Sequence, residues 1–294
     1  MTGSLTDVPG ILVGHAEVPG GGSGCTAILG PFRGRVCVPG LASGTRELEV
    51  LRAEHVTRRI DALLLSGGSA FGLAAAQGIV EWLEERGQGH WTPNGIVPIV
   101  PGAILYDLAV GKPRPGPEEG RAACDAASDG PVPEGQVGAG AGATVGKFAG
   151  FDHAVPGGIG SASCQVDGYT VGALAAVNAL GSVVGRDGKV MAGPDPDRTP
   201  LAIPSREGQN TTLCVVGTDA PLSPVDLGRV LTMAQTALAR RIVPVHTPFD
   251  GDVVFGVTTA EDIRPWESPE VMSLGLGATR VLEDAILAAV GGAS

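Results

Sequence analysis

Short apolar runs typical of strands alternate with segments of helical spacing along the first half of this chain. The helical segments repeat apolar residues every three or four positions, whereas the strand-like runs are short and bounded by glycine or proline. We therefore expect a mixed α/β protein. The predicted strands are Arg35–Val38 and Ala62–Leu65, and the predicted helices are Leu48–Ile60, Leu73–Glu85 and Glu118–Ala127.

The second half continues this alternation and contains two clear boundary signals. A long extended segment, Tyr169–Val184, bends back at Asp187-Gly188, a dipeptide typical of hairpins. Ser223 and Pro224 predict the start of a helix, because serine caps helix N-termini and proline suits the first helical position. The remaining predicted elements are a strand after Thr211, a strand over Val253–Thr258, a helix over Pro269–Val290, and an exposed proline-rich loop over 194–206.

Composition indicates a globular protein with one core. Of the 294 residues, 43% are hydrophobic and 17% are charged, which argues against disorder. The 47 glycines and the low aromatic content of 4% indicate tight turns and close packing of small side chains. Because no internal repeat and no linker divide the sequence, we expect a single catalytic domain, 1–294.

Charge and cysteine usage exclude several classes of protein. The net charge is −11 and no basic stripe is visible, so a nucleic-acid partner is not expected. The five scattered cysteines form neither a metal nor a disulfide framework and suit a reducing compartment. The N-terminal residues lack the pattern of a signal peptide, and glycine, proline or asparagine interrupts both long uncharged runs. We therefore expect a cytoplasmic protein with no membrane partner.

The candidate chemistry lies where two apolar strands begin. Asn210–Thr212 runs into one predicted strand, and Asp250–Asp252 runs into another. Cleavage before Thr211 would give this residue a free α-amine with an ordinary pKa of about 7.7–8.0, which can take the proton of its own hydroxyl. The same residues also suit a plain strand start and a solvated turn, because threonine favours strands and asparagine and aspartate favour turns.

Two glycine-rich segments are similar to known motifs but depart from them. Gly138–Lys147 fails the P-loop pattern, since Phe148 follows the lysine, and nucleotide binding is not expected. Ser69 does not form a nucleophile elbow, because Phe71 breaks the G-x-S-x-G pattern. Gly68 and Ser69 instead predict a turn near a substrate pocket.

The histidines lack the spacing of metal ligands, and we expect neither a metal nor a cofactor. His246 lies four residues before Asp250, so a Ser/His/Asp-type arrangement with Thr211 is an alternative. We prefer the carboxylates, because an N-terminal amine makes a histidine base unnecessary. Asp250 and Asp252 would share one face of an extended segment and repel each other, so a cation such as Lys147 or the Thr211 ammonium should compensate them.

A series of short motifs runs in order along nearly the whole chain: Val13–His15, Gly24–Thr26, Gly44–Glu47, Ser66–Leu73, Val97–Pro101, Gly138–Lys147, Asn178, Asn210–Thr212, Pro248 and Asp250–Asp252. Together they resemble the self-processing aminopeptidase family, which includes L-aminopeptidase/D-Ala-esterases, β-aminopeptidases and nylon-oligomer (6-aminohexanoate oligomer) hydrolases. The resemblance implies a four-layer αββα sandwich with two central sheets and the nucleophile at a strand start between them.

The resemblance also implies how the chain would mature. It would cleave itself between Asn210 and Thr211 into an α chain, 1–210, and a β chain, 211–294. Thr211 would then attack the amide of a small peptide or amino-acid amide. The processed heterodimers would assemble into a homo-oligomer.

The same family pattern implies a role for each of the other site residues. Asn178 would stabilise the tetrahedral oxyanion, and Tyr106 would assist it. Asp250 and Asp252 would orient the nucleophile and its amine, and Lys147 would tune them. Without the family, Asn178 suits a buried structural amide and Lys147 a solvated surface lysine.

One departure limits what the resemblance says about substrate. The aminopeptidase members have a serine nucleophile and a Ser-x-Glu pair, whereas this chain has Thr211 with Asp250 and Asp252, as in the nylon-oligomer hydrolases. Two other functions remain as alternatives: an acyltransferase of the ornithine acetyltransferase type, and an uncleaved binding protein without enzymatic activity.

Overall fold

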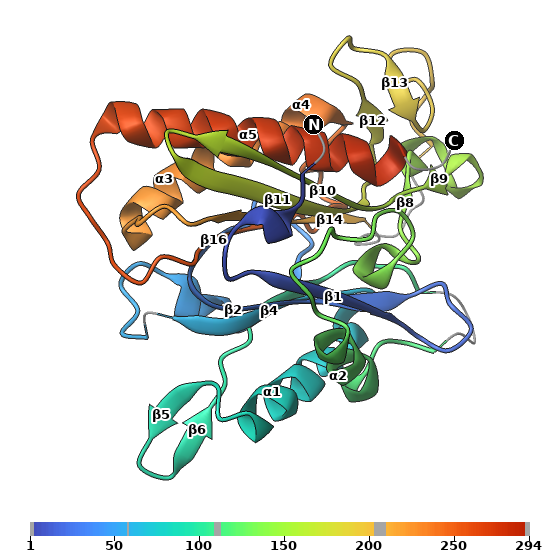
Figure 1. The fold of residues 1–294 in the computed structure, drawn as a ribbon. Helices are drawn as coiled ribbons and strands as arrows, with labels where there is room; N and C mark the ends of the chain where they lie inside the picture. The colour runs from blue at the N-terminus through green and yellow to red at the C-terminus, as the bar shows by residue number, and fades with distance from the viewer. Residues whose placement is uncertain (1–2, 58, 109–112, 203–209, 292–294) are drawn as a thin grey trace.

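Two layers of β-strands lie between two layers of helices in the computed structural model of this chain (Figure 1). The structure describes residues 3–57, 59–108, 113–202 and 210–291. The helices of one outer layer are α3 (Pro224–Ala234), α4 (Thr236–Arg241) and α5 (Ser268–Gly291), and those of the other are α1 (Ala75–Glu85) and α2 (Pro117–Asp125). The expected four-layer αββα sandwich is thus confirmed.

The upper sheet in Figure 1 contains β10 (Gly158–Val166), β11 (Tyr169–Asn178), β14 (Thr211–Thr218) and β16 (Val253–Thr258), with β14 and β16 parallel. The lower sheet contains β1 (Leu12–Glu17), β2 (Gly24–Cys37), β3 (Gly44–Arg46), β4 (Ile60–Ser66) and β7 (Gly102–Ile104). Smaller sheets are formed by β12 (Ser182–Val184), β13 (Val190–Ala192) and β15 (Ile242–Val243), by β5 (His90–Thr92) and β6 (Gly95–Val97), and by β8 (Thr144–Val145) and β9 (Val155–Pro156). Short 3-10 helices lie at Leu5–Asp7, Leu48–Leu51, Ser69–Ala74, Gly138–Gly140, Lys147–Ala149 and Phe151–His153.

Strand β2 is much longer than the expected strand Arg35–Val38, and it belongs to both central sheets. Its residues 25–29 pair with β4, and residues 33–37 pair with β16. The pairing shifts register between Leu29 and Phe32, where the strand passes from one sheet to the other. The two sheets are therefore continuous through a single strand. The local pattern did not indicate this, because a strand of this length depends on partners far away in the sequence.

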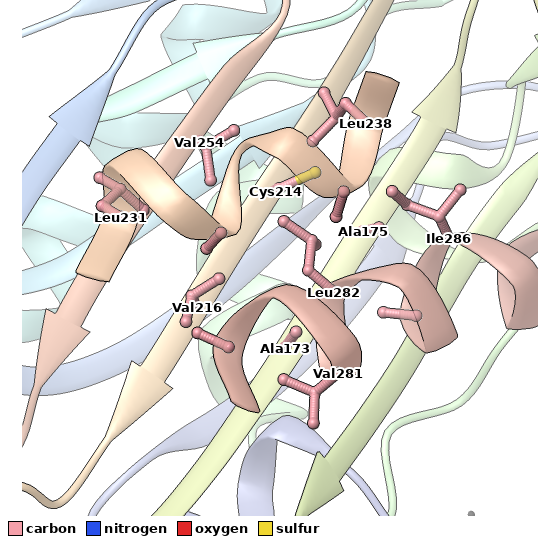
Figure 2. Close-up of a cluster of buried hydrophobic side chains, with 14 of the residues drawn as sticks. Ala173, Ala175, Cys214, Val216, Leu231, Leu238, Val254, Val281, Leu282 and Ile286 are labelled. Atoms are coloured by element: carbon pink, nitrogen blue, oxygen red, sulfur yellow. The ribbon is translucent and has the colours of Figure 1, made fainter. Parts of the chain in front are cut away.

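The upper core lies between α3, α4 and α5 and the upper sheet (Figure 2). Leu231 and Leu238 approach from α3 and α4, and Leu282 approaches from α5. They pack on small residues of the strands, including Ala175 of β11 and Cys214 of β14. Since β11 precedes residue 210 and the helices follow it, this core is built from both sides of the predicted cleavage point.

A second core lies between the two sheets and a third between the lower sheet and helices α1 and α2. Phe32 and Phe255 are the largest side chains of the second core, and both are buried. The third core is formed by smaller residues, such as Ile79 of α1 and Leu64 of β4. The abundance of glycine and alanine fits this design, because flat layers pack closely only where side chains are small.

The helix expected over Leu48–Ile60 is wrong. Only Leu48–Leu51 is helical, as a short 3-10 turn that follows Glu47 in a left-handed conformation with φ 57°. Ile60 belongs instead to β4 and pairs with Phe32 of β2. Val56, which supplied part of the helical spacing, is 89% exposed. Pairing with a distant strand therefore outweighs the local periodicity at the end of this segment.

Most of the other elements agree with the sequence prediction. Ser223 caps α3, since its side chain accepts a hydrogen bond from the Asp226 N–H, and Pro224 opens the helix. The helix ends at Ala234, however, so the apolar residue Leu238 lies on α4. Residues 203–206 of the expected proline-rich loop lie outside the described residues. Among the helices that the structure describes, none combines the length and the apolar character needed to cross a bilayer.

Candidate active site

Thr211 is the first residue of β14, which lies between β11 and β16 in the upper sheet. On one side it pairs with Asn178, the last residue of β11. On the other side the preceding residue, Asn210, forms a bridge with Asp250 just ahead of β16. Strand ends from distant parts of the chain thus bring these four residues together, and all four are buried.

The Thr211 hydroxyl lies against the peptide bond that precedes it. Its Oγ1 donates a hydrogen bond of 2.5 Å to the carbonyl oxygen of Asn210, and the Gly251 N–H donates to the same oxygen at 2.8 Å. A Cβ at Gly251 would lie 2.8 Å from Thr211 Oγ1 and 2.7 Å from the carbonyl oxygen of Ala42, so a side chain has no room there. The Asn210 carbonyl oxygen therefore has two donors, of which the Gly251 N–H is placed to stabilise an oxyanion at that position.

Lys147 and Asn178 form the second part of the site. The Lys147 ammonium donates to the main-chain oxygen of Asn178 at 3.1 Å and to its Oδ1 at 2.8 Å. Oδ1 also accepts from the Thr144 N–H, while Nδ2 donates to the carbonyl oxygen of Tyr106. Because two donors meet Oδ1 and an acceptor meets Nδ2, the orientation of the amide is determined by its partners.

The charge of Lys147 is held in a buried position, with 2% of the residue exposed. Burial lowers the pKa of its ammonium from 10.5 to about 7, although the carboxylates of Asp250 and Asp107 act in the opposite direction. The alternative of a solvated surface lysine is therefore wrong. A buried amine whose proton is exchangeable near neutral pH is a frequent feature of active sites.

The Asp250 carboxylate is held by main-chain and hydroxyl donors. Its Oδ1 accepts from the Leu180 N–H at 3.2 Å, and its Oδ2 accepts from the hydroxyl of Thr247 at 2.5 Å and from the N–H of the same residue at 3.1 Å. Burial raises the pKa of Asp250, the nearby Asp252 carboxylate raises it further, and the hydrogen bonds oppose both effects. The turn is therefore a buried one, and the alternative of a solvated Asp-Gly-Asp turn is wrong.

The Asp252 carboxylate holds the start of β14 by a hydrogen bond with the main chain of that strand. Its Oδ1 accepts from the Thr212 N–H at 2.7 Å. Its Oδ2 accepts from the main-chain N–H of His246 at 3.3 Å and lies 2.8 Å from Nδ1 of the same side chain. Asp252 thus contacts the main chain of the residue that follows Thr211. The Thr211 hydroxyl itself donates to the carbonyl oxygen of Asn210.

The turn at Gly68 and Ser69 is tied to the same region. Gly68 and Ser69 have left-handed φ angles of 79° and 54°. The Gly68 N–H donates to Asp107 Oδ1 at 2.6 Å, and the Ser69 N–H donates to the Leu105 carbonyl oxygen. Burial raises the pKa of Asp107, which follows directly after Tyr106. The turn therefore lies close in space to the segment that holds the Asn178 amide, although it is 39 residues away from Asp107 in sequence.

The structure brings most of the predicted site residues into one hydrogen-bonded region. Tyr106 contacts this region through its carbonyl oxygen, which accepts a hydrogen bond from Nδ2 of Asn178. Contributors that were absent from the prediction include Thr247, Asp107 and the N–H of Gly251. The Thr-x-x-Asp spacing that places Thr247 on the Asp250 carboxylate could have been recognised as a turn motif, because hydroxyl residues hydrogen-bond locally in turns.

Comparison with known proteins decides the family. The profile of Peptidase family S58 matches residues 3–294. This chain belongs to peptidase family S58. It is 39% identical to an uncharacterised aminopeptidase of Mycobacterium leprae, over 98% of this chain and 90% of that protein. It is 30% identical to a 6-aminohexanoate-oligomer endohydrolase of Paenarthrobacter ureafaciens, over 96% of this chain and 84% of that protein.

Solved structures agree with this S58 assignment at the level of the fold. The L-aminopeptidase D-Ala-esterase/amidase of Ochrobactrum anthropi, a variant of the Ntn hydrolase fold, has a TM-score of 0.76 at 22% identity. A β-aminopeptidase of Burkholderia sp. has a TM-score of 0.74 at 22% identity. Each comparison covers 98% of this chain and 86% of the other. The S58 protein is thus a hydrolase of peptide or amide bonds, which disfavours the acyltransferase and the non-enzymatic binding protein.

Proposed function

We propose that this peptidase is a self-processing amide hydrolase in which Thr211 becomes an N-terminal nucleophile. The observation that carries the proposal is the position of Thr211 Oγ1, 2.5 Å from the carbonyl oxygen of Asn210, with the Gly251 N–H on the same oxygen. A hydroxyl next to a peptide carbonyl that already has a second donor is arranged for attack on that carbonyl.

Self-cleavage would proceed as an acyl shift followed by hydrolysis. Thr211 Oγ1 attacks the Asn210 carbonyl carbon, its proton passes to a neighbouring base, and the Gly251 N–H stabilises the oxyanion. The C–N bond then breaks, its nitrogen takes a proton, and an ester joins Asn210 to the Thr211 oxygen. Water hydrolyses this ester, which leaves a carboxylate on Asn210 and restores the Thr211 hydroxyl beside a free α-amine.

In the mature enzyme the same hydroxyl would attack substrate, with the Thr211 amine as general base. Nδ2 of Asn178 carries a second hydrogen besides the one donated to Tyr106, and this hydrogen would stabilise the substrate oxyanion. Lys147 holds the Asn178 amide in that orientation. Asp250 compensates the Lys147 charge, and Asp252 would fix the strand that carries the nucleophile.

The proposed substrates are peptides and amino-acid amides. The names of the relatives refer to aminopeptidases and to a 6-aminohexanoate-oligomer hydrolase, and both classes of substrate contain an amide next to an amino-acid unit. The protein would act as one catalytic domain cleaved into 1–210 and 211–294, and such heterodimers would form the homo-oligomer. A panel of p-nitroanilides and amides of α-, β- and ω-amino acids tests this proposal. Absence of turnover across the panel by fully cleaved protein would reject the substrate class.

Gly251→Ala should block maturation without unfolding the chain. The added methyl group would press on Thr211 Oγ1 and on the Ala42 carbonyl oxygen, so the N–H that meets the Asn210 carbonyl must shift. We expect cleavage to slow by about 10²-fold or more, the usual cost of losing an oxyanion donor. Gly130→Ala is the matched control, because a Cβ there meets only Ser128 Oγ at 3.5 Å. Gel electrophoresis over time measures the rate, and circular dichroism checks the fold. Equal rates for both variants would contradict the assigned role of the Gly251 N–H.

The two pieces should stay together after cleavage. They share the upper core, and Arg186 of the first piece forms ion pairs with Glu283 at 2.9 Å and Asp284 at 2.7 Å in the second. Glu283 is buried, so its pairing is less screened by solvent than a surface pair. Arg186→Gln should therefore lower the urea concentration at which the pieces separate. The control is Arg198→Gln, whose exposed partner lies within the first piece. Size-exclusion chromatography in urea is the measurement, and identical midpoints would show that the Arg186 pairs are dispensable.

A further inference from the structure

His246 makes a close contact with the site but has no role in the hydrolysis described above. Its Nδ1 lies 2.8 Å from Asp252 Oδ2, and its main-chain N–H donates to the same oxygen at 3.3 Å. The Asp252 residue is 1% exposed, whereas 22% of the His246 side chain is exposed. The side chain is thus partly exposed, although its Nε2 atom is buried and has no hydrogen-bond partner among the described residues. Since a carboxylate only accepts hydrogen bonds, Nδ1 must carry a proton.

We propose that His246 is a positioning residue that keeps the Asp252 carboxylate aligned, so that Asp252 can hold the start of β14 for reaction at Thr211. This inference rests on the proposed function and adds to it a second buried carboxylate with a side-chain partner. The first pair is Lys147 with Asp250, and the second is His246 with Asp252. Each buried carboxylate thus has its own cationic or hydrogen-bonding partner.

The charges around Asp252 show why such a partner is needed. Asp250 lies two residues away, and the repulsion between the carboxylates contributes to the raised pKa of Asp250. From β14, Cys214 faces Asp252, but burial raises the pKa of its thiol well above its ordinary value, so it stays neutral. Lys147 acts on Asp250. In the cleaved protein the Thr211 amine is a further neighbour, one residue from the Thr212 N–H that Asp252 holds.

The connection from His246 to the nucleophile runs through a short series of contacts. His246 holds Oδ2 of Asp252, and Oδ1 of Asp252 accepts from the Thr212 N–H. Thr212 follows Thr211 directly in β14. Without the imidazole, Oδ2 of Asp252 would keep only the longer contact from the His246 main-chain N–H, and the carboxylate could turn away from the Thr212 N–H. The start of the strand would then lose the anchor that fixes the Thr211 hydroxyl.

His246 also has an uncommon main-chain conformation, with φ 53°. Left-handed angles are rare outside glycine, and histidine, asparagine and aspartate are the other residues that adopt them most often. Asparagine is therefore the best substitute, because it accepts this conformation and its amide can donate to Asp252. Glycine also accepts this conformation but carries no side-chain donor, so the two variants separate the hydrogen bond to Asp252 from the main-chain conformation.

The experiment compares four proteins: wild type, His246→Gly, His246→Asn and the control His153→Asn, which changes an exposed histidine in the 3-10 helix at Phe151–His153. For fully cleaved samples, kcat and KM are determined separately. We expect His246→Gly to lower kcat about tenfold or more, with KM within about threefold of wild type, and His246→Asn to recover most of this loss.

The control should match wild type. Equal kcat in His246→Gly and His246→Asn would overturn the proposal, because alignment of the Asp252 carboxylate requires a hydrogen-bond donor that only asparagine supplies. If either His246 variant accumulates as full-length chain, the rates of self-cleavage of the two variants are compared in the same way. Thr211→Ala is assayed in parallel: activity there would reject the nucleophile itself, an outcome distinct from failure of the His246 proposal.

Discussion

Thr211→Ala is expected to remain a single chain of 29.5 kDa with hydrolysis reduced by roughly 10⁴-fold or more. The substitution removes the hydroxyl that donates to the Asn210 carbonyl, and it removes the atom that would attack substrate. The wild-type chain should instead yield pieces of 210 and 84 residues. Intact-mass spectrometry of fresh and aged protein measures cleavage, and turnover of the best substrate of the amide panel measures activity.

Two neighbouring variants test whether this loss is specific to the nucleophile. Thr211→Ser keeps a hydroxyl and should still cleave, because the reacting group is retained. Thr212→Ala keeps the main-chain N–H that contacts Asp252, so it should also cleave and hydrolyse. Full activity of wild-type protein that remains one chain would reject self-processing. Wild-type turnover by Thr211→Ala would reject the assignment of the nucleophile.

Lys147→Met should give the second largest loss of activity, about 10²-fold or more. Methionine fills much of the space of the lysine stem, but it cannot donate to Asn178 or balance the charge of Asp250. The Asn178 amide then loses one of the donors that fix its orientation, and its proposed contact with the substrate oxyanion becomes less well placed. The loss should appear mainly in kcat. Lys189→Met is a matched control, since this exposed lysine pairs only with Asp187 among the ion pairs of the described residues.

The same substitution should change how stability depends on pH. The Lys147 pKa is about 7 in the folded chain against 10.5 ordinarily, so between these values the unfolded chain binds a proton that the folded chain does not. The free energy of unfolding therefore rises with pH across this window, by about 1 kcal/mol or slightly more per pH unit. As pH falls from 10.5 through 7, this contribution is lost.

This linkage is best measured in an uncleaved background, where one chain unfolds. Urea denaturation of Thr211→Ala should show a free energy of unfolding that increases from pH 7.5 to 9.5. Thr211→Ala/Lys147→Met should show a smaller increase, and the difference between the two slopes is the lysine contribution. Equal slopes would mean that Lys147 keeps its ordinary pKa in the folded chain, which its burial argues against.

The buried charged groups make this site costly to fold. Lys147, Asp250 and Asp252 are all buried, and burial of charged groups is unfavourable unless each is paired and hydrogen-bonded. The main-chain donors at Leu180 and Thr212 supply part of this compensation. Such an arrangement is usual where catalysis needs groups whose protonation changes near neutral pH. Variants that neutralise the site should consequently lose activity without losing the fold.

The sequence by itself determined the elements whose signals are local. Ser223 and Pro224 start α3 as predicted, because capping depends on residues within one turn. Strand β14 begins at Thr211, just before an apolar run, and β16 begins with the apolar run that follows Asp252, since a buried strand needs a continuous apolar segment. The order of the motifs along the chain also predicted the family, and with it the four-layer fold.

Only the tertiary structure decided the features that depend on distant partners. Strand β2 spans both sheets because β4 and β16 offer it pairing partners, and Ile60 leaves the predicted helix to pair with Phe32. Lys147 can be buried because Asn178, 31 residues away in sequence, accepts hydrogen bonds from its ammonium group. The partnership of His246 with Asp252 requires a left-handed turn that periodicity cannot reveal. Residue type and spacing specify which groups are present, whereas the orientation and protonation of each group depend on neighbours that only the folded chain brings within hydrogen-bonding distance.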